Sequence, residues 1–244
     1  MNKKLLLLPT VFFLITSCSN NISPVDLGLE NQIFHFGNGS EPQGLDPHIV
    51  TGVPEHHLLI SLCEGLTTEH PKGGPSQPGA AESWEISEDG KEYIFYLNKN
   101  AKWSNGAPVT SEDFIWSWKR ILTASLGSQY PDMLYYLVNA SEYHNGLIDD
   151  FDDVGIKAID KYTLKVTLKS PTPFFLGLLS HYSTWPVHKD TVLKYGEIDD
   201  RNGEWTRPGN FVCNGPFQLK TWELNNKIVV EKNPHYWDAE TVKL

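Results

Sequence analysis

The chain has 244 residues, enough for one large domain or two smaller ones with a sizeable core. Its 30 acidic and 20 basic residues give a formal net charge of −10. This acidic balance argues against nucleic acid as a partner and against a grip on anionic lipid through basic side chains. The 8 Trp, 10 Tyr and 11 Phe suit a core plus a concave binding surface, although a large aromatic core alone would also explain them.

The N-terminus has the pattern of an export signal. Lys3 and Lys4 precede an apolar run over 5–15, and small residues lead directly to Cys18. This order predicts a lipoprotein signal peptide over 1–17, lipid on Cys18 and a polar, flexible tether over 18–30. An ordinary secretory signal with an incidental cysteine is the alternative. We expect an extracytoplasmic protein that is lipid-anchored to a bacterial membrane. The sequence does not decide whether the host cell has one membrane or two.

The first half of the chain predicts short elements separated by glycine-rich and proline-rich loops. Thr110 can cap a helix whose first turn carries Glu112 and Asp113, which favour the positive end of the helix dipole. The expected elements are a strand at 32–36, a loop at 37–44, a helix at 54–64, a loop at 72–79, a strand at 93–97, a turn at 102–106 and a helix at 110–122.

The second half predicts two hairpins with helices between them. The expected elements are a short helix at 132–138, strands at 154–159 and 162–168 with a turn at 160–161, helices at 174–179 and 191–195, and strands at 217–222 and 227–231 with a turn at 225–226. Hairpins that alternate with helices, without a regular strand-helix-strand series, favour a mixed α/β or α+β fold.

Motifs for catalysis and for metal binding are missing. The sequence has no nucleophile elbow, zinc-protease motif or complete phosphate loop. His56 and His57 are adjacent on a predicted helix and do not share a face, and the acidic run 149–153 lacks the spacing of a calcium loop. We therefore expect a non-enzyme with no catalytic residue, metal or cofactor. Cys63 and Cys213 could pair or stay free buried thiols.

Six ordered stretches are more specific. Together they resemble the extracytoplasmic oligopeptide-binding proteins, the family 5 solute-binding components of peptide ABC transporters. A single stretch, such as the Asn-Gly turn, would be a weak signal. The stretches are Gly39–His48, Leu62–Leu66, Ala80–Leu97, Ala101–Phe114, Asn214–Phe217 and Asn233–Asp238.

This resemblance implies a periplasmic-binding-protein-like fold that closes on its ligand by a hinge motion. Lobe I would contain 31–53 and 175–244, and a small domain at 54–174 would be inserted into it. Relatives continue into a second lobe, so we expect an N-terminal portion with that lobe missing, that is, a truncated receptor.

The resemblance also implies the ligand and its site. Relatives hold an extended oligopeptide by pairing with its main chain, which tolerates many peptide sequences. Glu41, Pro42 and Gln43 are expected to pair with the peptide, Trp116 or Tyr130 to add an aromatic wall, and Asn214 and Gly215 to line the cleft. Each group also has an ordinary structural explanation: a loop cap for Glu41, core packing for the aromatic residues and a simple turn for Asn214 and Gly215. The expected partners are an oligopeptide, the permease subunits of the transporter and, through Cys18, the membrane, with the protein itself a monomer.

Two other classes stay open. A truncated lipoprotein remnant or surface interaction protein would have lost peptide binding. An extracytoplasmic hydrolase would need a nucleophile with its base or a metal set, and the sequence offers neither.

Overall fold

A computed structural model describes residues 23–242, which fall into two compact units divided after Gly37. The signal peptide and Cys18 lie outside the described residues. In the first unit, α1 spans Pro24–Asn31, where a flexible tether was expected. Its N-cap Ser23 accepts a hydrogen bond from the Asp26 amide (3.1 Å), and the helix ends at Gln32 with a left-handed φ of 55°.

The strand predicted at 32–36 is wrong. This segment has no regular secondary structure, and Ile33, Phe34 and Phe36 are exposed. The Ile33 amide donates to the Gly28 carbonyl (2.8 Å), which closes the end of α1. Alternation alone cannot make a strand, because a strand also needs a neighbour to pair with.

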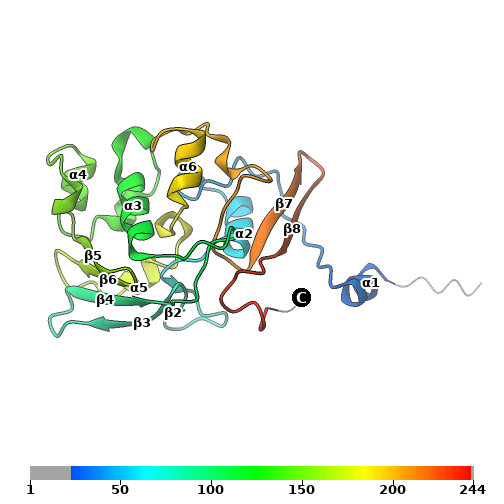
Figure 1. The fold of residues 1–244 in the computed structure, drawn as a ribbon, viewed down its shortest axis with the longest axis horizontal. Helices are drawn as coiled ribbons and strands as arrows, with labels where there is room; N and C mark the ends of the chain where they lie inside the picture. The colour runs from blue at the N-terminus through cyan, green and yellow to red at the C-terminus, as the bar shows by residue number, and fades with distance from the viewer. Residues whose placement is uncertain (1–22, 243–244) are drawn as a thin grey trace, which may run out of the picture. The chain divides into compact units, whose positions relative to one another are not determined.

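The second unit, Asn38–Lys243, contains a four-stranded antiparallel sheet in the order β3-β4-β6-β5 (Figure 1). In its centre Phe95 pairs with Trp84 on one side and Leu164 on the other. The strands are β3 (Ala81–Ile86), β4 (Glu92–Leu97), β5 (Ile156–Asp160) and β6 (Thr163–Thr167).

Helix α3 (Ser111–Leu122) covers this sheet and completes the first core (Figure 1). The Asp113 carboxylate accepts hydrogen bonds from the amide and hydroxyl of Thr110, so the predicted helix start is confirmed. Trp118 is fully buried, and its ring nitrogen donates to the Thr184 carbonyl (2.8 Å), whereas Trp116 is half-buried. The two tryptophans therefore point apart, as their spacing predicts.

A second core joins distant segments of the chain. Helix α2 (Val53–Leu62) and helix α6 (Lys189–Tyr195) pack with the hairpin of β7 (Phe217–Glu223) and β8 (Lys227–Lys232). The buried side chains are Leu45, Val50, Leu59, Leu62, Cys63, Tyr182, Trp185, Val187, Val192, Trp205, Phe211, Cys213 and Leu219.

The remaining elements are short. They are β1 (Thr67–Thr68), β2 (Gln77–Pro78), α4 (Ala140–His144), α5 (Phe175–Leu178) and 3-10 helices at Ala124–Leu126, Pro131–Leu134, Phe151–Asp153, Tyr182–Thr184 and Glu204–Thr206. The helix predicted at 132–138 is wrong: a 3-10 helix ends at Leu134, and α4 begins only at Ala140, after Asn139, where φ is 60°. Within residues 23–242, no helix is both long and apolar enough to cross a bilayer.

The predicted hairpins are confirmed, and β3 is an additional strand. Asn225 adopts a left-handed φ of 55° in the turn between β7 and β8, as an Asn-Asn turn allows. β3 was not predicted because its sequence, Ala-Glu-Ser-Trp-Glu-Ile, is mostly exposed and its strand conformation depends on pairing with β4. The mixed α/β fold class is confirmed.

Candidate functional site

The segment Asn38–His48 contains the three residues predicted to pair with a peptide. At its start the Asn38 amide group donates to the Pro54 carbonyl (3.1 Å). The exposed Glu41 carboxylate accepts from the Trp222 ring nitrogen (2.6 Å) and the Asn225 amide (3.0 Å). These contacts tie the segment to α2 and to the β7–β8 hairpin.

Gln43 is held from the side of α2. Its amide donates to the Glu55 carboxylate (2.6 Å), and Glu55 is only 3% exposed. Pro42 is buried, whereas the Gln43 side chain is exposed. Within the described residues, no main-chain hydrogen bond joins residues 39–45 to another backbone group. The position of this stretch is therefore set by side chains of other elements.

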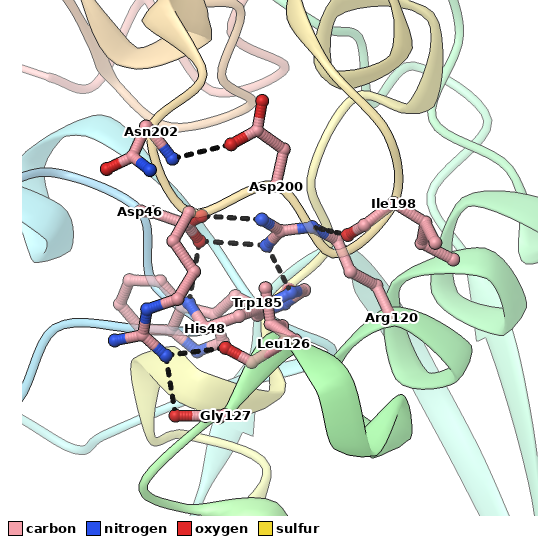
Figure 2. Close-up of polar contacts among 10 residues, drawn as sticks. Asp46, His48, Arg120, Leu126, Gly127, Trp185, Ile198, Asp200 and Asn202 are labelled. Atoms are coloured by element: carbon pink, nitrogen blue, oxygen red, sulfur yellow. Dashed lines mark hydrogen bonds and ion pairs between the residues drawn. The ribbon is translucent and has the colours of Figure 1, made fainter.

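The end of the segment is fixed by a buried ion pair between Asp46 and Arg120 of α3 (Figure 2). Arg120 Nη1 donates to Asp46 Oδ1 (2.9 Å) and Nη2 donates to Oδ2 (2.6 Å), a bidentate contact. Asp46 Oδ1 also accepts from the His48 amide (3.0 Å). Burial pushes the pKa of Asp46 upward, but the Arg120 charge and hydrogen bonds outweigh it, so the pKa lies below its usual value.

Other contacts fix the Arg120 guanidinium on its remaining sides. Its Nε donates to the Ile198 carbonyl (2.9 Å), and its central carbon lies 5.7 Å from the centre of the Trp205 ring. Nearby, Arg201 donates to the carbonyls of Leu126 and Gly127, which holds the loop after α6 against the chain that follows α3.

His48 is neutral in this network. Burial and the nearby Arg120 charge lower its pKa to about 4. Arg120 Nη1 lies 3.1 Å from His48 Nδ1, and because a guanidinium can only donate, Nδ1 must accept. The ring proton is then on Nε2, which donates to the Trp185 carbonyl (3.0 Å).

The two predicted aromatic residues both pack against the second core. Trp116 and Tyr130 are half-buried. Tyr130 makes edge contacts with His181 and Tyr182, at centroid distances of 5.2 and 6.4 Å, and His56 lies 5.7 Å from Tyr182. The structure therefore places aromatic rings from α2, from α3 and from the 3-10 helices at Pro131–Leu134 and Tyr182–Thr184, with the residues that precede them, around the second core.

Asn214 and Gly215 form an internal junction. The Asn214 side chain accepts from the Glu64 amide (3.0 Å) and donates to the Glu64 carbonyl (2.8 Å), and Asn214 is 3% exposed. The Gly215 amide donates to the Leu62 carbonyl (2.9 Å). A Cβ at Gly215 would lie 2.6 Å from the Leu62 carbonyl carbon, so this close approach requires glycine.

Glu64 is a buried carboxyl group that the sequence did not single out as a functional residue. It accepts from the Tyr236 hydroxyl (2.7 Å) and from the Trp237 ring nitrogen (2.9 Å). Burial raises its pKa to about 7 despite these hydrogen bonds, and the nearby Asp238 raises it further. Within residues 23–242, no lysine, arginine or histidine forms an ion pair with it.

Cys63 and Cys213, beside this junction, are free buried thiols, which decides between the two possibilities left open by the sequence. Burial raises the pKa of both, to about 12 for Cys213. In the part of the chain that the structure describes, no cluster of three or more His, Cys, Asp or Glu could hold a metal ion.

The missed residues Asp46, His48 and Arg120 carry only a weak sequence signal. Asp46 and His48 are within a recognised motif, but Arg120 is 74 residues from Asp46. Its position three residues after the buried Ser117 puts it on the inward face of α3, and a charged residue there requires a buried partner. Helical spacing could therefore have pointed to Arg120, but not to its partner.

Comparison of the chain with known proteins finds a matching family, similar sequences and similar structures. Residues 76–244 match the family described as bacterial extracellular solute-binding proteins, family 5, middle. The chain is 45% identical over 216 residues to the periplasmic oligopeptide-binding protein OppA of Escherichia coli strain K12. This match covers 87% of the chain and 38% of the relative, so the chain spans well under half of that protein.

Solved structures that share the fold include two oligopeptide-binding proteins. A periplasmic oligopeptide-binding protein, OppAIV, from Borrelia burgdorferi matches with a TM-score of 0.79 and 39% identity, over 84% of this chain and 40% of that one. Haemophilus influenzae OppA in complex with the peptide RPPGFSPFR matches with a TM-score of 0.77 and 38% identity, over 84% of this chain and 39% of that one. The structure is thus part of a periplasmic-binding-protein-like fold, and the chain belongs to the family 5 bacterial extracellular solute-binding proteins.

Proposed function

We propose that this chain forms one side of the binding cleft of an oligopeptide-binding protein that serves an ABC transporter. In this proposal Glu41, Pro42 and Gln43 run beside an extended peptide and pair with its main chain. Affinity then comes from groups that all peptides share, so many peptide sequences are accepted.

The main support is that residues 39–45 make no backbone–backbone hydrogen bond in the described part of the chain, although the Gln43 amide donates to the Glu55 side chain. This stretch has no main-chain partner within residues 23–242, yet side chains of α2, α3 and the β7–β8 hairpin hold it in place. An exposed, pre-positioned backbone can accept an added strand with little further ordering cost. The Haemophilus influenzae relative has been crystallised with a nine-residue peptide.

We also propose the division into lobe I and an inserted domain. The two cores support it, because the sheet and α3 form one core and the segments around residues 45–62 and 182–219 form the other. Helix α2 packs in the second core, so the inserted domain would begin after Leu62 rather than at residue 54. In this arrangement Trp116 and Tyr130 would offer their partly exposed rings to peptide side chains.

The remaining parts of the proposal concern location and partners. The protein is delivered outside the cytoplasm, is tied to the membrane by lipid on Cys18 and acts as a monomer that hands peptide to permease subunits. It binds peptides without cleaving them.

Calorimetry with the full chain and a set of tripeptides to pentapeptides tests the proposal. We expect binding of peptides with different side chains to agree within about ten-fold. N-methylating one central peptide bond, which removes a main-chain donor, should weaken binding at least ten-fold. Mass spectrometry after the titration should recover intact peptides. Absence of binding by every peptide, or cleavage that one substitution abolishes, contradicts the proposal.

A further inference from the structure

We propose that Arg120 and Asp46 are positioning residues that set the place of the peptide-pairing segment Glu41–Gln43. The inference rests on the proposed function for its meaning, but its structural part can be tested without a peptide. Neither residue is expected to touch the peptide.

The first argument concerns what holds the segment. Residues 39–45 have no main-chain partner in the described part of the chain, so their position depends on side-chain contacts. The contact of Glu41 with Trp222 is exposed to water, which competes for its hydrogen bonds. The side chains of Arg120 and Asp46 are 0% and 12% exposed, so their contact keeps its geometry with little competition from water or salt.

The second argument concerns the precision of the contact. Four hydrogen bonds, to Asp46, His48 and Ile198, fix the guanidinium in its plane (Figure 2). The Trp205 ring lies beside the guanidinium. Arg120 comes from α3, which is packed on the four-stranded sheet. The rigid first core therefore determines where Asp46 lies, three residues beyond Gln43. A lysine has no planar fork and could not reproduce this set of contacts.

The third argument concerns energy. A buried ion pair is weak support for stability, because desolvating both charges offsets much of their attraction. Replacing both partners with neutral groups can leave stability almost unchanged, whereas removing one leaves a buried charge. A paired substitution can therefore separate positioning from folding.

The experiment compares the double variant Arg120→Met/Asp46→Asn with the wild type. Asparagine keeps an oxygen that can accept the His48 amide, and the pair of changes removes both charges. The matched control is Lys169→Met/Glu142→Gln, which removes an ion pair between Lys169 and Glu142 of α4, with side chains 36% and 38% exposed. Thermal unfolding, peptide affinity and hydrogen exchange of the Gln43 amide, which donates to the buried Glu55 carboxylate, are measured for each full chain.

We expect the double variant to unfold cooperatively, to bind peptides at least ten-fold more weakly and to exchange the Gln43 amide at least ten-fold faster without peptide. The control should match the wild type in all three. Arg120→Lys keeps the charge and should show the same losses of affinity and of amide protection to a smaller extent. If the double variant does not fold, the affinity and exchange of Arg120→Lys test the inference in its place.

Affinity and exchange equal to those of the control would overturn the inference. If the wild type binds no peptide, the proposed function fails, while the exchange rates still show whether Arg120 and Asp46 position the segment.

Discussion

Glu64 should make the stability of the protein depend on pH near neutrality. Its carboxyl group is buried and has two neutral donors, Tyr236 and Trp237, in place of a cation. Burial raises its pKa from an ordinary value of 4.5 to about 7. The folded protein therefore keeps a proton on Glu64 at pH values where the unfolded chain has lost it.

The sign and size of the effect follow from proton linkage. The stabilising contribution of the protonated group is complete below pH 4.5 and is lost as the pH rises to about 7. Across this window the free energy of unfolding should fall by about 3 kcal/mol, at up to about 1.4 kcal/mol per pH unit. Above pH 7 the contribution of Glu64 no longer changes.

Glu64→Gln should remove this dependence. The glutamine oxygen can accept from the Trp237 ring nitrogen while its amide group donates to the Tyr236 hydroxyl oxygen, so the variant resembles the protonated acid. Urea unfolding at pH values from 4.5 to 8 measures both proteins, with Glu88→Gln, at an exposed position, as the control. We expect the variant to be more stable than the wild type at pH 8 by about 2–3 kcal/mol and equal to it near pH 4.5.

The reasoning would be refuted if the difference between wild type and Glu64→Gln were constant over this pH range. An equal change in the Glu88→Gln control would also refute it, because the effect would then not come from burial of Glu64.

Three further predictions concern other parts of the chain. Gly215→Ala should destabilise the protein by about 1–3 kcal/mol in urea unfolding because its Cβ would meet the backbone of Leu62, whereas Gly177→Ala, with nothing within 4 Å, should not; equal effects would contradict this. Cys63 and Cys213 should resist a thiol reagent at pH 8 until the protein unfolds, because both are buried and their pKa values are raised; rapid labelling of the folded protein would count against it. Cys18→Ser should abolish incorporation of radiolabelled palmitate in a bacterial host, and unchanged incorporation would exclude lipid on this residue.

Much of the local structure can be predicted from the sequence. The capped start of α3 at Thr110, the two hairpins and the Asn225 turn all depend on residues a few positions apart, and the structure confirms them. The resemblance of six stretches to a known family likewise predicted the fold class. Local pattern failed at 32–36, where alternation met no neighbouring strand, and at β3, whose pairing with β4 overrides a polar composition.

The roles of the site residues depended on tertiary structure. Contacts between Asp46 and Arg120, Glu64 and Asn214, and Glu64 and Tyr236 join residues 74, 150 and 172 positions apart. No local preference encodes such pairs, because each forms only when two cores have brought the segments together. The sequence by itself determined most of the elements and the family, through short-range propensity and shared motifs. Three properties were decided only by the folded chain. Asn214 is bonded to the backbone of Glu64, Glu64 keeps its proton up to about pH 7, and Arg120 reaches the segment that contains Glu41–Gln43. Burial and long-range contact create these properties, and neither can be seen in the local sequence.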